Sequence, residues 1–334
     1  MADAFANPIM VDALILGREG TMVVPDTNYY APELPGIDAP DEMDRWEPWV
    51  RAYTALGEML QGISFETSGN AFQVLSSGSL LAEIGRPQEA TFQAQMPLVL
   101  SWAELRNERA TEIMAQIDSP YAFWSSIIYM HPDRTQRTFE LVNIVLQFCV
   151  YVEMRFKHAL ACWRPVEYNA QVQPMITTPG HGSFPSGHAT QVHAVAHVLK
   201  RLLMLSSTNL GHEMISEQLD RQAARIATNR VVAGVHFPID SMAGRMLGVA
   251  LGDYFVGRCT KGQTLTGRKF IAGGIDANPT TEFNPYHADQ KSLSSGPFYS
   301  TSSVPKNVES PLMEYVWRKA QAEWAGKFGV PPPP

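Results

Sequence analysis

Apolar residues recur every three or four positions along most of the chain, the spacing of one buried face of an α-helix. The longest such stretch, residues 135–160, is mostly apolar, and we expect a helix at the centre of a bundle. The same pattern predicts further helices over residues 48–60, 105–117, 188–205, 213–233, 238–256 and 311–325. No convincing alternation of apolar and polar residues interrupts them, so we predict an all-α fold, a helical bundle.

Two stretches lack the helical pattern. Residues 1–40 are rich in Pro, Asn, Tyr and Asp, and we interpret them as an extended N-terminal arm. Residues from about 257 to 310 are dense in Gly, Ser, Thr, Asn and Pro, which predicts a long irregular segment, suited to a lid or a subunit arm. We predict one helical domain over residues 41–330, in a chain whose two irregular segments wrap a neighbour in a homo-oligomer.

Composition narrows the class of protein. The 334 residues are 45% hydrophobic and 18% charged, which is ordinary for a globular protein. The formal net charge of -7 argues against nucleic acid as a partner. The three cysteines are too few and too scattered for a disulfide framework, and we expect free thiols.

The chain shows no signal for export or for membrane insertion. Its first residues lack a basic region followed by an apolar one. The most apolar stretch, residues 141–152, is well short of the roughly 20 residues that cross a bilayer. We therefore expect a soluble, cytoplasmic protein that does not span a membrane.

A small-residue turn, Pro185-Ser186-Gly187-His188, leads into one predicted helix. Its amides and the positive end of the helix dipole favour an anion, and the hydroxyl of Ser186 can add a donor. Taken alone, Ser186 is better explained as a helix cap, and the other residues of the pattern reverse that balance.

Three cations point to the same ligand. Arg164 and Arg230 keep their charge at accessible pH and can each present a planar fork to two oxygens, while Lys157 supplies a point charge. Both arginines have apolar neighbours in sequence, and a buried arginine needs an anion. The inventory predicts a pocket for a tetrahedral oxyanion, as in phosphoryl transfer or vanadate chemistry.

His236 and Asp240 stand four residues apart across Pro238, which suits the first turn of a helix. Asp240 can then accept a hydrogen bond from one ring nitrogen of His236 and leave the other free to attack or to ligate. The alternative is a purely structural bond that ties two helices together.

In order along the chain, these residues form three blocks: Lys157-x6-Arg164-Pro165, Pro185-Ser186-Gly187-His188 and Arg230-x5-His236-x3-Asp240. Together they resemble the signature shared by type 2 phosphatidic acid phosphatases, bacterial class A acid phosphatases and vanadium-dependent haloperoxidases. The resemblance covers residues 157–240 and implies the all-helical bundle of these enzymes.

The resemblance to haloperoxidases implies a vanadate cofactor, with vanadium bonded to His236 and His188 as the acid-base group. It places around the vanadate oxygens Lys157, Arg164, Ser186, Gly187 and Arg230. The partners implied are hydrogen peroxide, a halide and a small organic acceptor, with phosphate as a competitor. We favour this function because Trp163-Arg164-Pro165-Val166 and Thr178-Pro179-Gly180-His181 are most similar to bacterial haloperoxidases. His181 matches a position that is His in bromide-oxidising relatives, which favours bromide or iodide.

The alternative is a soluble acid phosphatase. There, His236 would attack phosphorus to form a phosphohistidine, and His188 would protonate the leaving alcohol. A binding module that keeps the pocket without turnover is a third possibility. Two features depart from the pattern: Asn229 stands where the family has Ser, and spacing identifies no carboxylate that would orient His188.

Overall fold

The computed structural model describes residues 7–21, 33–118, 120–262, 264–303 and 309–331. The chain divides into two units, Met1–Glu42 and Met43–Pro334. In the first unit, α2 (Pro8–Thr21) is a helix whose side chains are all exposed. The predicted extended arm is therefore wrong for residues 8–21, and residues 1–6 and 22–32 lie outside the described part of the chain.

The second unit contains the predicted helices. They are α3 (Pro48–Leu60), α5 (Arg106–Ala115), α7 (Gln136–Leu160), α9 (Gly187–Leu202), α10 (Leu210–Val232), α11 (Pro238–Cys259) and α14 (Pro311–Ala322). The short helix that Ser119-Pro120 predicts is α6 (Tyr121–Ile128). Sequence analysis did not predict α4 (Glu89–Trp102), α8 (Pro165–Tyr168), α12 (Ala272–Asp276) or α13 (Ala288–Lys291), nor the 3-10 turns at Pro40–Arg45, Ala103–Leu105 and Ala170–Val172. No helix among the described residues is long and apolar enough to cross a lipid bilayer.

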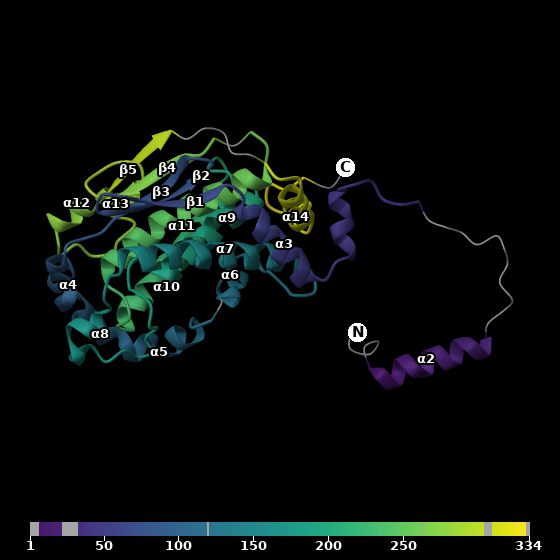
Figure 1. Cartoon of the computed structure of the whole chain (residues 1–334). Coiled ribbons are helices and arrows are strands. Elements are labelled where there is room, and N and C mark those ends of the chain that lie inside the picture. Colours follow the sequence, from purple (N-terminus) through teal and green to yellow (C-terminus); the bar gives the residue numbers. More distant parts are fainter. Residues whose placement is uncertain (1–6, 22–32, 119, 263, 304–308, 332–334) are drawn as a thin grey trace. The chain divides into compact units, whose positions relative to one another are not determined.

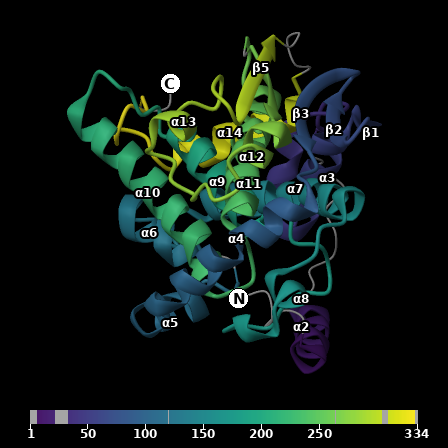
Figure 2. The ribbon, with the colours of Figure 1, turned by 90° about the vertical axis from the view of Figure 1, so that its left-hand side faces the viewer.

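Helices α7, α9 and α11 form the centre of this unit, as Figures 1 and 2 show. Three glycines spaced by four residues, Gly244, Gly248 and Gly252, let α11 lie directly on α9. A Cβ on Gly248 would stand 2.2 Å from the carbonyl oxygen of Thr190, a distance that real atoms do not tolerate. This close packing fixes the first turns of α9 and α11 side by side, where two of the three sequence blocks lie.

A five-stranded sheet covers one side of these helices, so the all-α prediction is wrong and the fold is mixed α/β (Figures 1 and 2). The strands lie in chain order, β1 (Ile63–Ser68), β2 (Ala71–Ser76), β3 (Ser79–Gly85), β4 (Thr266–Phe270) and β5 (Tyr299–Ser303). Only β3 and β4 pair in parallel, with Ala82 opposite Arg268. Strand β2 packs on α7, and strands β3 and β4 pack on α11.

The predicted irregular segment at about 257–310 is also partly wrong, because β4, α12, α13 and β5 lie within it. Strand β4 joins the sheet through a partner far away in sequence, and β5 pairs with β4 in antiparallel register. The segment therefore belongs to the folded unit.

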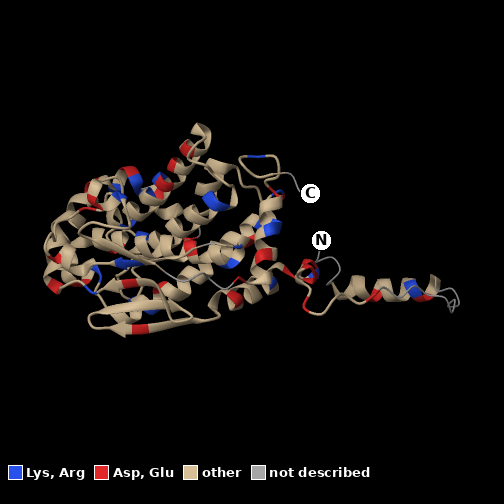
Figure 3. Ribbon diagram, turned by 90° about the horizontal axis from the view of Figure 1, so that it is seen from above, with Lys and Arg blue, Asp and Glu red and all other residues tan. Residues whose placement is uncertain are grey.

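Charges of both signs are interspersed along the ribbon of this unit (Figure 3).

Candidate active site

The last turns of α7 and α10, the first turn of α9 and the turn leading into α11 meet at a cavity of about 310 Å³. Most of the site residues predicted from sequence line it: Lys157, Arg164, His181, Gly187, His188, Arg230 and His236. Of the predicted set, Asp240 and Ser186 do not line it: Asp240 bonds to His236, and the amide of Ser186 donates to Asp240 O. The structure thus brings the three sequence blocks together.

Arg164 is buried and caps the start of α8. Its Nε donates to His181 O at 3.1 Å and its Nη1 to Val235 O at 2.8 Å. Nη1 also lies 3.2 Å from Nε2 of His236, and Nη2 lies 3.2 Å from Nδ1 of His181. Burial is the main cause that lowers the pKa of Arg164, although the guanidinium still keeps its charge. Arg164 holds the loop at 181–182 against the turn that carries His236.

Arg230 is completely buried near the end of α10. Its Nη2 donates to the side-chain oxygen of Gln116 at 3.0 Å and to Ile113 O at 3.3 Å. Within the described residues its Nε and Nη1 are buried without a hydrogen-bond partner. Burial lowers its pKa to about 10, so the charge persists at neutral pH. Buried donors normally have partners, and two unpaired ones on a cation indicate room for an anion.

Asn229 and Gln116 orient Arg230 from behind. The Asn229 amide donates to Gln116 Oε1 at 3.0 Å and to Glu112 Oε1 at 2.9 Å, and its oxygen accepts from Arg109 at 3.1 Å. Asn229 stands where a Ser was expected, and it joins three side chains in one hydrogen-bond network. Sequence analysis did not predict Gln116, because it caps the C-terminal end of α5 and no spacing links it to the motif.

Lys157 lies in the last turn of α7, as predicted, and is buried. Its ammonium donates to Gly182 O at 3.1 Å and to Ser183 O at 2.9 Å. Burial, followed by the charge of Arg164, lowers its pKa. Two carbonyl partners leave one N–H of the ammonium for a ligand.

His236 and Asp240 form the predicted pair. Nδ1 of His236 lies 2.8 Å from Oδ2 of Asp240, which also accepts from the hydroxyl of Ser183 and from Phe237 N at 3.0 Å. Burial raises the pKa of Asp240 to about 6, so it is ionised at neutral pH. Burial and the charge of Arg164 hold the pKa of His236 well below its usual value. The ring is therefore neutral, with its proton on Nδ1 and a lone pair on Nε2 beside Arg164.

His188 stands in the first turn of α9, and its Nε2 lies 2.9 Å from the main-chain oxygen of Gln116. Burial, and next the charge of Arg230, lower the pKa of His188 to about 4. The ring is neutral in the free protein and donates from Nε2, so Nδ1 is left to carry a transferred proton.

The turn before α9 contributes fewer donors than predicted. The amide of Ser186 donates to Asp240 O at 2.9 Å, and its hydroxyl accepts from Ala189 N at 3.4 Å, so Ser186 caps the helix and ties it to α11. Gly187 and His188 supply the first amides of α9, which no carbonyl of the same helix can accept. The anion-binding end of α9 consists of these two amides.

Glu153, which sequence analysis missed, also lines the cavity. It lies one turn before Lys157 on α7, is 4% exposed, and accepts from the amide of Gln191 at 2.9 Å. Burial raises its pKa. The helical spacing of four residues before Lys157 was the available signal, since residues so spaced share a face.

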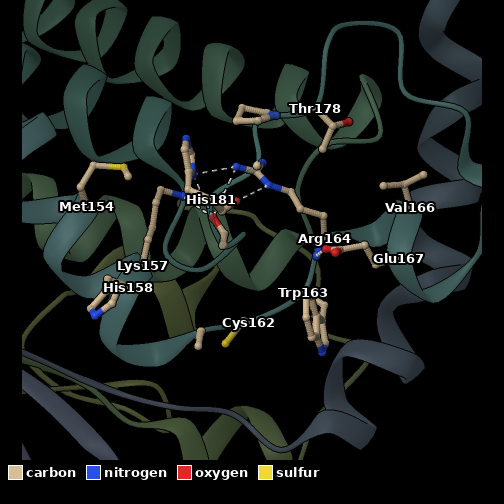
Figure 4. Close-up of a pocket in the computed structure, with 14 residues that line it drawn as sticks. Met154, Lys157, His158, Cys162, Trp163, Arg164, Val166, Glu167, Thr178 and His181 are labelled. Atoms are coloured by element: carbon tan, nitrogen blue, oxygen red, sulfur yellow. Dashed lines mark hydrogen bonds between the residues drawn. The ribbon is translucent and has the colours of Figure 1, made fainter.

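A second cavity of about 520 Å³ adjoins the first and shares Met154, Lys157, Arg164, Pro179 and His181 with it. Figure 4 shows Lys157, Arg164 and His181 converging on one side of this cavity, with Cys162 and Trp163 on the other. Burial lowers the pKa of His181, which lies against the guanidinium of Arg164.

Known proteins match this part of the chain. Residues 139–257, from α7 through α11, match the model of the PAP2 superfamily. No curated protein matches the chain. Among solved structures it is similar to the first transmembrane PAP2 type phosphatidylglycerolphosphate phosphatase from Bacillus subtilis, with 21% identity, 52% of this chain and 90% of that chain covered, and a TM-score of 0.41. The superfamily predicted from the three blocks is supported, while the closer likeness to bacterial haloperoxidases stays a prediction.

Proposed function

We propose that this chain is a phosphatase that hydrolyses phosphoric monoesters through a phosphohistidine at His236. The observation that carries the proposal is the pair of unpartnered donors on buried Arg230, in a cavity that His236 also lines. A tetrahedral oxyanion would satisfy those donors, and the match to the PAP2 superfamily supports phosphate as that oxyanion.

The cations of the cavity would bind the three oxygens of the phosphoryl group that do not carry the organic group. Arg230 offers Nε and Nη1, Lys157 offers its remaining N–H, and the first amides of α9 complete the set. Charge held in this buried position stabilises the transition state more than it would in water.

In the first step, Nε2 of His236 attacks phosphorus and the bond from phosphorus to the ester oxygen breaks. That oxygen takes a proton from His188, whose pKa rises when a bound phosphate-ester anion offsets the charge of Arg230. Asp240 stabilises the positive charge that develops on the His236 ring. In the second step, His188 removes a proton from water, which attacks the phosphohistidine and releases phosphate.

A second candidate is the vanadium-dependent haloperoxidase, and the observation that favours it is His181 in contact with Arg164 at the edge of the cavity. The unpaired donors of Arg230 and the lone pair on Nε2 of His236 fit vanadate as well as phosphate, because both are tetrahedral oxyanions. When bound, vanadate would supply the chemistry that activates hydrogen peroxide toward a halide. Lys157, Arg230 and the first amides of α9 would hold its oxygens.

One sample separates the two candidates. Purified full-length protein is assayed for hydrolysis of para-nitrophenyl phosphate and for peroxide-dependent bromination of a dye, each with and without orthovanadate. The phosphatase predicts hydrolysis that vanadate inhibits, with no bromination. Bromination that requires vanadate and that phosphate suppresses, without ester hydrolysis, would replace the phosphatase by the haloperoxidase.

A further inference from the structure

A carboxylate is an unexpected neighbour for a bound anion, yet Glu153 lines the oxyanion cavity. Its Oε1 is bonded to Gln191, whereas Oε2 is buried without a hydrogen-bond partner in the described part of the chain. Both oxygens lie against the first turn of α9, because a Cβ on Gly187 would stand 2.5 Å from Oε1 and 3.4 Å from Oε2. The glycine at 187 thus makes room for the carboxylate at the end of α9 that attracts an anion.

Two negative groups in one buried cavity repel each other unless a proton lies between them. A hydrogen bond from a P–OH to Oε2 would satisfy the unpaired carboxylate oxygen and remove the repulsion. A ligand without a proton would leave Oε2 unpaired next to a second anion, at a cost typical of a buried unsatisfied group.

We infer that Glu153 determines specificity by admitting tetrahedral oxyanions that carry a proton, such as hydrogen phosphate or a phosphate-ester monoanion, and by rejecting sulfate. The inference rests on the oxyanion cavity of the proposed phosphatase, but it concerns binding and does not require turnover. Sulfate matches hydrogen phosphate in shape and in charge at mildly alkaline pH and differs by lacking the proton.

The other titratable groups around Glu153 affect the affinity for phosphate and the affinity for sulfate equally. On α7, the titratable neighbours of Glu153 are Lys157 and Cys149. The other titratable residues that line the cavity are Arg164, His181, His188, Arg230 and His236. Because hydrogen phosphate and sulfate are both dianions at about pH 8.5, changes in these groups cancel in the ratio of the two affinities. The ratio of the two affinities therefore reports the effect of the proton between the ligand and Glu153. Burial raises the pKa of Glu153, so at lower pH it can supply the proton itself and tolerate sulfate.

The test is calorimetric titration of the full-length protein with inorganic phosphate and with sulfate at about pH 8.5 and about pH 6. We expect phosphate to bind about 100-fold more tightly than sulfate at the higher pH. Sulfate affinity should rise as pH falls, by up to about tenfold per pH unit above the pKa of Glu153, because its binding takes up one proton.

The informative variant is Glu153→Gln, which keeps the shape and supplies an amide donor. It should bind sulfate within about tenfold of phosphate and lose most of the pH dependence specific to sulfate. Glu66→Gln is the matched control, since it removes one carboxylate from the exposed face of β1. An unchanged ratio in Glu153→Gln with the same melting temperature, or a wild-type protein that binds sulfate as tightly as phosphate at about pH 8.5, would overturn the inference.

The two proposals fail separately. Selective phosphate binding without ester hydrolysis would refute the phosphatase and leave the role of Glu153 intact. Ester hydrolysis that sulfate inhibits as strongly as phosphate at about pH 8.5 would refute the role of Glu153 and leave the phosphatase intact.

Discussion

Arg164 and Arg230 are both buried arginines in one cavity, but their hydrogen bonds differ. Every guanidinium nitrogen of Arg164 has a partner within the protein, mostly main-chain oxygens of the loop at 181–182 and of Val235. Among the described residues, Arg230 is held by Nη2 alone and keeps two unpaired nitrogens. A buried cation with satisfied donors contributes to the structure, whereas one with spare donors is arranged for a ligand. The two arginines therefore have different roles, although the sequence pattern predicts the same role for both.

The largest expected effect follows from replacing Arg230. Arg230→Gln should lower kcat/KM for a phosphate ester by about 10²- to 10³-fold, since it removes donors from the developing charge. Stability without ligand should stay the same or rise, because an incompletely paired buried charge is lost. Steady-state kinetics and urea unfolding check both. A large loss of ligand-free stability would place Arg230 with Arg164 as a structural residue.

Arg164→Gln should have the opposite effect on stability from Arg230→Gln. Its main-chain bonds hold two segments together, so we expect a loss of about 2 to 3 kcal/mol in the free energy of unfolding, measured in urea without ligand. Arg230→Gln, unfolded in parallel, is the control. Equal stability of the two variants would contradict the division of roles.

A third prediction concerns the effect of the charge of Arg230 on the pKa of His188. The pKa of His188 is lowered to about 4, from an ordinary value near 6.5, by burial and then by Arg230. A lowered folded-state pKa adds stability that is complete above about pH 6.5 and is lost as pH falls through about 4. In Arg230→Gln the pKa of His188 should rise, and the loss of stability between about pH 6.5 and about pH 4.5 should shrink by about 1 kcal/mol. An unchanged loss, measured by urea unfolding at both pH values, would show that burial alone sets this pKa.

The smallest effect is expected from Gln116→Ala. Its side chain orients Arg230, while His188 bonds only to its main chain. We expect kcat/KM to fall about tenfold, with the pH profile that depends on His188 unchanged. A shifted profile would mean that the side chain also positions His188.

The sequence predicted the cavity better than the fold around it. Lys157 and Arg230 stand at the ends of helices that the helical period predicts, and the spacing within the blocks relates Arg164 and His236 to them. Their unequal bonding was not predictable, because Gln116 reaches Arg230 across 114 residues of sequence. The role of Glu153 was also missed, since a single acidic residue on an apolar helix has no motif of its own.

The sheet was missed for another reason. Strand β1 does alternate, with Ile63 and Phe65 half-buried and Ser64 and Glu66 exposed, but only over six residues. Strands β4 and β5 lie in a segment rich in Gly and Ser, and their place depends on the parallel pairing of β4 with β3. Such pairing between distant segments leaves no local pattern in the sequence.

The central claim is that Nε2 of His236 becomes covalently bonded to phosphorus. Full-length protein is mixed with a phosphate ester, quenched in alkali within milliseconds, and searched for phosphohistidine by mass spectrometry of its peptides. We predict phosphate on His236 in the wild-type protein and none in His236→Ala, together with loss of turnover. Ester hydrolysis by His236→Ala at the wild-type rate, or phosphate carried by a different residue, would contradict the account.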